Sequence, residues 1–320
     1  MRIIRHVRTT PQDLKRAVVA IGNFDGVHRG HQGIIGKARQ LAEASDCHTA
    51  VLTFEPHPRS VFQPDNPPFR LTPFRVKARL IQSLGVDALF ALPFNRALSS
   101  LEPDAFIEKV LVDGIRCGHV VVGDNFRFGR KRAGNIETLK AGGDKHGFGV
   151  TALTRMKSLG AEAYSSTGVR SYLSGGAPSQ AAMLLGRYYE VVGRVHHNDG
   201  VLTLAPEAIN LPAQGVYAVR VTVDETGGWA GAMAELLHIQ GTPHPTCRFS
   251  ILPIEQGPDI AGQAVRIAMI ERLGNLSEAI PDQSLNHRLS EHRDAAMGVL
   301  TSEDWTSSWP ASPILAGPHT

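Results

Sequence analysis

Two histidines three positions apart close a glycine-rich turn near the start of the chain. The stretch from Val18 to His31 reads VVAIGNFDGVHRGH, so four apolar residues are followed at once by Gly22, and His28 and His31 come at the end. A short apolar run that ends in such a turn predicts a buried parallel strand leading into a phosphate-binding loop. Glycine lets the backbone approach a phosphate closely. Imidazole N–H groups at the same place can donate hydrogen bonds that stabilise charge building on that phosphate.

The residues after the histidines predict the element that positions them. Apolar residues recur with helical spacing from Gln32 to Glu43, which predicts a helix that begins just after His31. Backbone N–H groups and the helix dipole favour an anion at that junction. Neither G-x-x-x-x-G-K-[ST] nor G-x-G-x-x-G follows the strand. Surface histidines or half of a zinc site are the alternatives, but no further zinc ligands stand nearby at a workable spacing.

A histidine between two prolines follows the next predicted strand. Ala50–Phe54 is predicted as that strand, and His57 stands between Pro56 and Pro58. Prolines stiffen the loop, and ligands of open α/β sheets collect at the carboxyl ends of the strands. From these residues alone, a polar turn with an incidental histidine is the simpler interpretation.

Aromatic and basic residues follow the strand predicted over His119–Val122. The loop reads GDNFRFGRKR over residues 123–132. Phe126 and Phe128 alternate, so in an extended chain they would face opposite ways and only one would face a ligand. The basic run Arg130–Arg132 has two interpretations, neutralisation of phosphates or a solvated charge run.

Hydroxyl residues and an arginine open a later predicted helix. The sequence YSSTGVR runs from Tyr164 to Arg170, and the helix is predicted to end at Gly175. Ser and Thr at a helix start are capping residues first. With the arginine, Ser166 and Thr167 could also bind a triphosphate at the helix N-terminus.

Taken in order, these motifs resemble the adenylyltransferase half of the bacterial bifunctional riboflavin kinase/FAD synthetases, nucleotidyltransferases with a His-x-Gly-His signature. The matching patterns are G-x-F-D-G-x-H-x-G-H-Q, T-F-x-P-H-P, G-x-[DN]-F-x-F-G-x-x-x-x-G and S-S-T-x-[IV]-R. The resemblance extends to about Tyr189 and weakens afterwards. It implies transfer of AMP from ATP to FMN, giving FAD and pyrophosphate, with Mg²⁺ bridging the ATP phosphates.

The resemblance also implies roles for individual residues. His28 and His31 would be catalytic and would stabilise charge on the ATP phosphates. The implied nucleotide-binding residues are Gly22, Phe24, Asp25, Ser166, Thr167 and Arg170, and the implied substrate-binding residues are His57, Asn125, Phe126 and Phe128. The metal ligands stay unassigned, and ATP is expected over CTP from the family alone.

Short β segments separated by turn signals follow Tyr189 and predict a small antiparallel barrel. They are similar to the family's riboflavin kinase domain, in which the threonine and asparagine of G-F-P-T-A-N-L hold Mg²⁺ and ATP phosphates. This chain has Asn210, but Ala208 stands at the threonine position and Glu207 at the proline position. Alanine offers no oxygen ligand to Mg²⁺.

A second kinase feature is also missing from the sequence. The segment Cys247–Leu252, expected to carry the kinase's catalytic glutamate, has no acidic residue, and Glu255 comes only after Pro253. We therefore expect the kinase activity to be lost.

The predicted fold class is α/β, with three segments along the chain. Residues 1–186 are expected to form a Rossmann-like nucleotidyltransferase domain with a parallel sheet. Residues 187–300 are expected to form the kinase-like barrel, with a helical stretch from Asp259 to Leu300, and residues 301–320 a disordered tail.

Composition limits the class of protein and its partners. With 42% hydrophobic and 20% charged residues, the chain has the composition of a soluble globular protein, and a net charge of +3 is too small to argue for nucleic acid or membrane partners. Three cysteines without paired spacing suggest a reduced cytoplasm. The expected partners are ATP and FMN, and the oligomeric state is left open.

Two other functions remain compatible with these motifs. The chain could be a catalytically retired flavin-binding or regulatory protein derived from the family, although four intact motifs argue against this. It could also be a nucleotidyltransferase that acts on the phosphate of another cofactor precursor.

Overall fold

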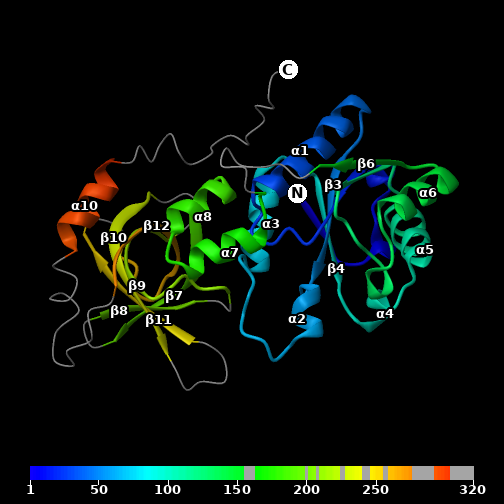
Figure 1. Ribbon diagram of the computed structural model, residues 1–320. Helices are drawn as coiled ribbons and strands as arrows, with labels where there is room; N and C mark the ends of the chain where they lie inside the picture. Colours follow the sequence, from blue (N-terminus) through cyan, green and yellow to red (C-terminus); the bar gives the residue numbers. More distant parts are fainter. Residues whose placement is uncertain are drawn as a thin grey trace. The chain divides into compact units, whose positions relative to one another are not determined.

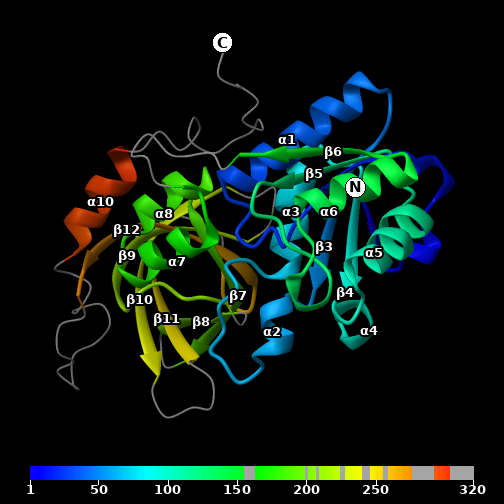
Figure 2. The ribbon, with the colours of Figure 1, turned by 45° about the vertical axis from the view of Figure 1, so that its right-hand side comes forward.

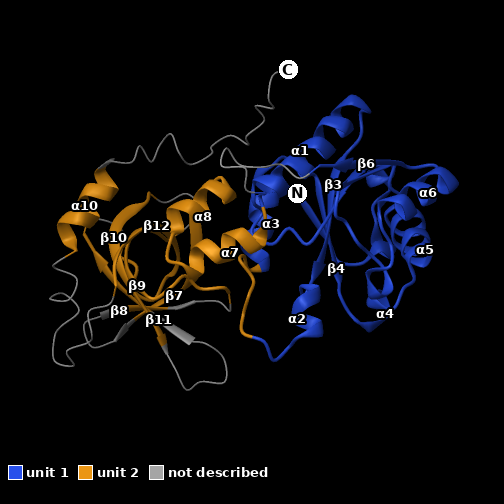
Figure 3. Ribbon diagram, in the orientation of Figure 1, with its two compact units in different colours: residues 1–66, 74–164, 312–320 blue, residues 67–73, 165–311 orange. Residues whose placement is uncertain are grey.

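The chain divides into two compact units, which we describe separately (Figure 3). The computed structural model describes residues 1–154, 163–198, 201–206, 209–223, 228–239, 246–254, 259–275 and 292–302. Unit 1 contains Met1–Asn66 and Phe74–Tyr164, and unit 2 contains Pro67–Pro73 and Ser165–Ala311.

Unit 1 is built on a six-stranded parallel sheet in the order β1-β4-β3-β2-β5-β6 (Figure 1). In that order the strands span Arg2–Ile4, Ala88–Pro93, Thr49–Glu55, Val18–Ile21, His119–Gly123 and Gly149–Leu153. Parallel neighbours need long crossover connections, which the helices of this unit supply. The chain moves outward from β2 through β3 to β4 and then returns to the opposite side of β2 with β5 and β6.

The helices of unit 1 lie in two layers on the two faces of this sheet. They are α1 (Arg29–Ala44), α2 (Pro58–Phe62), α3 (Phe74–Ser83), α4 (Arg96–Ser99), α5 (Pro103–Phe106) and α6 (Ile136–His146), with a π-helix η3 (Ile107–Ile115) and 3₁₀ turns at Val7–Thr9, Gln12–Leu14 and Arg130–Arg132. The two views show α5 and α6 together on one side of the sheet and α1 on the other (Figures 1 and 2). The π-helix η3 follows α5 directly, without a break in the chain.

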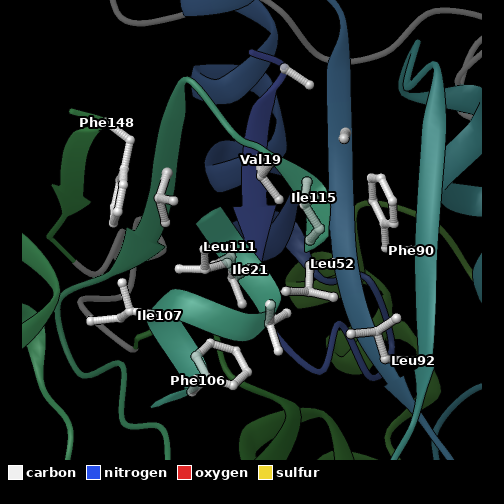
Figure 4. Packing of buried hydrophobic residues seen from close by; sticks show 14 of the residues in the cluster. Val19, Ile21, Leu52, Phe90, Leu92, Phe106, Ile107, Leu111, Ile115 and Phe148 are labelled. Atoms are coloured by element: carbon white, nitrogen blue, oxygen red, sulfur yellow. The ribbon is translucent and has the colours of Figure 1, made fainter. Parts of the chain in front are cut away.

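Alternate residues of the central strands supply two separate hydrophobic cores. Val19 and Ile21 of β2 and Leu52 of β3 pack with α5, η3 and α6 on one face, as Figure 4 shows. Val18 and Ala20 face the other way and pack with α1 and α3. A strand buried on both faces reads as a continuous apolar run, which is how the sequence predicted β2.

Unit 2 is a closed antiparallel barrel in the order β10-β11-β8-β7-β12-β9, with three helices among its described residues. From β7 to β12 the strands span Tyr189–Asn198, Val201–Pro206, Gly215–Thr222, Ala230–Ile239, Thr246–Pro253 and Ala264–Gly274. The helices are α7 (Ser166–Ser174), α8 (Pro178–Leu185) and α10 (Arg293–Ser302). Because the barrel is closed, the N–H and C=O groups at the strand edges are paired with a neighbouring strand. Helix α10 packs Ala296 and Leu300 against β9 and β12. The predicted fold class, a parallel α/β sheet followed by an antiparallel barrel, is confirmed.

The prediction of a helical stretch from Asp259 to Leu300 is wrong over its first part. Ala264–Gly274 forms β12, which pairs with both β7 and β9 and so closes the barrel. Several consecutive β12 residues are buried, because both faces of the strand are covered. That burial removes the alternation that distinguishes a strand from a helix in sequence. The last part of the stretch is helical, as α10.

The boundaries between domains stay predictions. The division into compact units places α7 and α8 with the barrel, whereas the sequence assigned residues up to 186 to the first domain. The expected tail lies outside the described residues from position 303 onward. None of the helices in the described part of the chain is long and apolar enough to span a membrane.

Candidate active site

The candidate site lies at the carboxyl edge of the unit 1 sheet, where the strand order reverses. β2 pairs with β3 on one side and with β5 on the other, so that Ala20 is in register with Val51 and Val121. The crossover from β2 runs through α1 to β3, while β5 returns on the opposite side. The loops after β2 and β5 therefore diverge at this point, which is where open α/β sheets bind their ligands.

The loop after β2 has a strained backbone. Phe24, Gly26 and Val27 have φ angles of 49°, 81° and 42°. Glycine adopts this region freely, but it costs other residues about 1–3 kcal/mol each. The Phe24 side chain is fully buried, and the side-chain amide of Gln32 donates to the Val27 carbonyl at 2.9 Å, which helps to hold the loop.

The predicted loop-shaping residues Gly22, Phe24 and Asp25 all lie in this loop. A Cβ on Gly22 would stand 3.3 Å from the Phe24 ring, so glycine leaves the ring its space. Asp25 is buried. These contacts explain why the loop needs these residue types, while their roles in nucleotide binding stay predictions.

His28 caps the N-terminus of α1. The backbone N–H of His31 donates to Nδ1 of His28 at 3.3 Å. Because Nδ1 accepts this hydrogen bond, the neutral imidazole carries its proton on Nε2. The helix begins at Arg29, so His31 lies inside its first turn and the prediction that both histidines precede the helix is wrong. The first turn of the helix was missed because Arg29 and Gly30 add no apolar side chain to the periodic pattern.

The two imidazole rings stack with centroids 3.6 Å apart and an interplanar angle of 20°. Burial, and then the neighbouring charges of His28 and Lys77, lowers the pKa of His31 well below its ordinary value of 6.5. Nδ1 of His31 is buried and has no hydrogen-bond partner within the described chain. His31 is therefore a neutral polar group near pH 7, at a helix end that attracts anions.

Lys77 is a site residue to which the sequence pattern gave no role. It lies on α3 and is 3% exposed. Its ammonium Nζ donates to the Asn23 carbonyl at 3.2 Å and lies 3.6 Å from the Glu55 carboxylate. The available signal was a lysine among the apolar positions of an amphipathic helix, between Val76 and Ala78.

His57 lies at the end of the neighbouring strand, after a cis Glu55–Pro56 peptide. It is buried and caps α2, because the backbone N–H of Arg59 donates to Nδ1 of His57 at 3.1 Å. The local structure thus gives His57 a capping role, and its predicted contact with substrate stays a prediction.

The loop after β5 contains Asn125, Phe126 and Phe128. Asn125 is exposed at the turn after Gly123, Phe126 is half-buried and Phe128 is buried. The prediction that the two rings face opposite ways is wrong, because they stack with centroids 5.5 Å apart. A turn over residues 123–126, closed by the N–H of Phe126 donating to the Gly123 carbonyl, comes just before the two rings, and Phe128 then bridges to Gly134.

An aromatic series continues from this loop along the carboxyl edge of the sheet. Phe128 contacts Phe106, which contacts Phe54 of β3, and Phe54 contacts Phe94. Phe94 then meets the ring of Phe62 on α2 edge to face, with 5.6 Å between centroids. Phe62 is 66% exposed, so the series begins in the core and ends in solvent.

The basic run after this loop forms an exposed 3₁₀ turn. Arg130 pairs with Glu102 at 3.0 Å, and both side chains are more than half exposed. Exposed pairs of this kind contribute about 0–1 kcal/mol. The geometry favours the solvated charge run over a phosphate contact for Arg130.

The remaining predicted nucleotide-binding residues belong to unit 2. Ser165 caps α7, with its hydroxyl accepting from the N–H of Gly168 at 3.0 Å, and Ser166 and Thr167 form the first turn. Arg170 donates from Nε to the Phe69 carbonyl at 2.7 Å. The local geometry thus gives Ser165 the capping role expected of hydroxyl residues at a helix start.

The kinase-motif positions of unit 2 are only partly described. Asn210 donates its N–H to the Arg70 carbonyl at 2.6 Å, and its own carbonyl accepts from the Tyr189 hydroxyl. Glu207, Ala208 and Glu255 lie outside the described residues. The expected loss of kinase activity stays a prediction.

Comparisons with known proteins agree with this arrangement. The FAD synthetase family model matches residues 10–168. The bifunctional riboflavin kinase/FMN adenylyltransferase of Pseudomonas fluorescens is 36% identical over 239 residues, which are 72% of this chain and 76% of that protein. The protein of that name from Escherichia coli K12 is 35% identical over 230 residues, or 69% and 73% of the two chains. The chain belongs to this family.

The fold is also similar to a solved structure along nearly the whole chain. A crystal structure titled macrolide-efflux protein, from Streptococcus pneumoniae, covers 94% of this chain and 98% of its own, with a TM-score of 0.81 and 23% identity. At that identity the likeness establishes the fold of this family member, and its function must come from the site.

We predict that Gly30→Ala displaces the His28 ring. A Cβ at position 30 would lie 3.1 Å from the His28 imidazole and 3.3 Å from Cβ of Tyr164, so the ring must shift slightly against His31 to make room. The imidazole proton resonances of His28 and His31 should shift in NMR spectra. Gly298→Ala is the matched control, because a Cβ at this other helical glycine meets nothing within 4 Å. Unchanged imidazole resonances in Gly30→Ala would contradict the prediction.

We predict that His31 makes the protein less stable as the pH falls below 6.5. The unfolded chain binds the His31 proton near pH 6.5 and the native state only at lower pH, so acid favours unfolding. The loss is at most about 1.4 kcal/mol per pH unit within that window. Urea unfolding from pH 8 to pH 5 should give a shallower dependence for His31→Gln than for the wild type. Equal slopes would show that His31 titrates alike in both states.

Proposed function

We propose that the protein is an FMN adenylyltransferase, which transfers AMP from ATP to FMN and releases FAD and pyrophosphate. The observation that carries this proposal is the stacked pair His28 and His31 at the N-terminus of α1, on the switch point of a parallel sheet. The activity named for the curated relatives supports the same reaction.

The reaction needs no protein nucleophile. An oxygen of the FMN phosphate attacks the α-phosphorus of ATP, the new P–O bond forms, and the bond to the pyrophosphate oxygen breaks. Catalysis is then a matter of positioning the two phosphates and stabilising the charge that grows on their oxygens.

His28 and His31 would supply that stabilisation as hydrogen-bond donors. Nδ1 of His28 accepts a hydrogen bond in the helix cap, so the donor that this ring would offer to a phosphate is Nε2–H. The backbone N–H groups of the first turn of α1 add a fixed positive potential at the same place. Gly22, Phe24 and Asp25 would shape the loop that brings backbone close to the nucleotide.

The triphosphate contacts of Ser166, Thr167 and Arg170 are proposed from the motif alone. The metal is proposed as Mg²⁺ carried in by ATP, as part of the substrate. No group of three or more His, Cys, Asp or Glu side chains able to hold a metal occurs within the described residues, so the donor set favours a metal that arrives with the phosphates.

FMN would lie along the carboxyl edge near the loops after β3 and β5. Exposed Asn125 can offer hydrogen bonds to a polar ring edge, and Phe126 and exposed Phe62 offer aromatic surface. His57 would contact the substrate next to this aromatic surface. Phe128 is the weakest of the predicted substrate contacts, because its ring packs in the core against Phe106.

The other functions stay open to the same assay. A regulatory flavin-binding protein would bind FMN without turnover, and an enzyme for another cofactor phosphate would show a different acceptor. CTP in place of ATP, and the cytoplasmic location expected from the cysteines, remain to be measured.

We predict that purified protein with Mg²⁺ and ATP converts FMN to FAD but yields no product from riboflavin. The first result follows from the site, and the second from Ala208 at the kinase threonine position. Chromatography of endpoint reactions, run separately with each flavin, measures both. FMN or FAD formed from riboflavin would contradict the loss of kinase activity, and no FAD from FMN would contradict the proposed function.

We predict that His28→Ala abolishes FAD formation, with a fall in kcat of about 100- to 1,000-fold or more. This variant also loses the helix cap, so His28→Asn is the companion variant, since asparagine restores a capping acceptor without the imidazole. Both should stay inactive, while His6→Ala, at an exposed histidine, should match the wild type. Near-normal turnover by a folded His28→Asn protein would show that the His28 imidazole takes no part in catalysis.

A further inference from the structure

Lys77 is a buried cation beside the phosphate loop. It lies on α3 with 3% of its surface exposed, among Val76, Ala78 and Ile81, which are all buried. Lysine is almost never buried to this extent unless its ammonium is paired. The helix would bury an apolar side chain here at lower cost, so the contacts of the ammonium need an explanation.

The ammonium and a neighbouring hydroxyl converge on one backbone carbonyl. Nζ of Lys77 donates to the carbonyl oxygen of Asn23 at 3.2 Å, and the hydroxyl of Thr53 donates to the same oxygen at 3.1 Å. Nζ also lies 3.5 Å from the Thr53 hydroxyl and 3.6 Å from the Glu55 carboxylate. Thr53 is fully buried, so this cluster is shielded from water.

The Asn23 carbonyl belongs to the peptide that starts the strained turn. A trans peptide is planar, so fixing the direction of the Asn23 carbonyl also fixes the N–H of Phe24 in the opposite direction. The next residues take the positive φ angles at Phe24, Gly26 and Val27. A backbone in that region persists only where its surroundings determine it.

We propose that Lys77 is a positioning residue, whose buried ammonium holds the Asn23 carbonyl and thereby the loop that leads to His28 and His31. The inference rests on the proposed function, because the loop is taken to bind nucleotide phosphates. It adds a residue that touches neither nucleotide nor flavin and acts through the loop.

The electrostatic effect of Lys77 on His31 agrees with this placement. After burial and the charge of His28, the positive charge of Lys77 is the next cause that lowers the pKa of His31. Glu55 lies 3.6 Å from the ammonium and is the acidic group that faces it from β3. Lys77 thus adds to the effect of burial, which is the main cause of the lowered pKa of His31.

A purely structural ion pair would not require this lysine. Replacing a buried pair by apolar groups of similar volume is often neutral or stabilising, whereas removing one partner leaves an uncompensated charge. The two charges can therefore be removed together, and the effect on the loop can be separated from the effect on folding.

The first experiment compares Lys77→Met, Lys77→Arg and Arg75→Met. Arg75 is an exposed residue of the same helix and serves as the matched control. For Lys77→Met we expect kcat for FAD formation to fall about 100-fold, the Kd for MgATP in calorimetry to rise, and the KM for FMN to stay unchanged. Lys77→Arg should recover part of kcat, and Arg75→Met should match the wild type.

An NMR titration of the His31 imidazole supplies a readout that a structural role would not move. Loss of the nearby cation should raise the pKa of His31 toward its ordinary value in Lys77→Met and leave it low in Lys77→Arg. A folded Lys77→Met protein with normal kcat and an unshifted His31 titration would overturn the proposal.

Two further variants keep the test decisive if Lys77→Met does not fold. Lys77→Met/Glu55→Gln removes both charges, and Thr53→Val removes the second donor to the Asn23 carbonyl while keeping the ammonium. We expect the double variant to fold with the same loss of kcat, and Thr53→Val to lose about tenfold. Full activity in the double variant would overturn the proposal, whereas full activity in Thr53→Val would show that Lys77 holds the Asn23 carbonyl without help from Thr53.

The failure of this proposal is distinguishable from the failure of the proposed function. Wild-type protein that forms no FAD from FMN would overturn the function. The His31 titration and MgATP binding need no FMN, so they would still decide whether Lys77 positions the loop.

Discussion

The central constraint in unit 1 is the burial of β2 on both faces and along both edges. All four residues of β2 are buried, and the strand is paired with β3 and β5. The backbone of β2 is hydrogen-bonded to β3 and β5, and its side chains are packed in the two cores. The loop at its carboxyl end is therefore where this part of the chain can meet a ligand. The place of α1, and with it of His28 and His31, follows from where β2 ends.

A second constraint is electrostatic, and it divides the site into neutral and charged parts. Burial makes an imidazolium costly at His31, while the amino group of Lys77 contacts the Asn23 carbonyl, the Thr53 hydroxyl and the Glu55 carboxylate. The side proposed to meet phosphate presents N–H donors, and the cation of Lys77 lies behind the loop. Preorganised dipoles of this kind need little rearrangement when charge develops on a substrate.

The sequence predicted what depends on local pattern and missed what depends on tertiary contacts. The apolar run at Val18–Ile21 identified the strand, and the glycines identified the turn. The first turn of α1 was missed because Arg29 and Gly30 carry no periodic signal. The stacking of Phe126 on Phe128 could not be foreseen, because it depends on a turn and on core packing against Phe106.

Lys77 shows the same limit at a single position. In sequence it is a basic residue of an amphipathic helix, and helices carry many of these on their solvated faces. Only the packing of α3 against the sheet shows that this lysine faces inward, toward Asn23. For β12, burial on both faces removed the alternation that marks a strand.

The two units differ in how far fold and chemistry can be connected. In unit 1 the strained loop and the buried ammonium each carry a cost that the fold alone does not require, and both lie at the carboxyl edge of the sheet, beside the capped end of α1. In unit 2 a closed barrel gives a complete structural reason for its strands, since closure removes edges whatever the barrel binds. The expected loss of kinase activity, based on Ala208 at the threonine position, is therefore compatible with an intact barrel. The strain of the unit 1 loop, by contrast, is a feature that the proposed nucleotide ligand would explain.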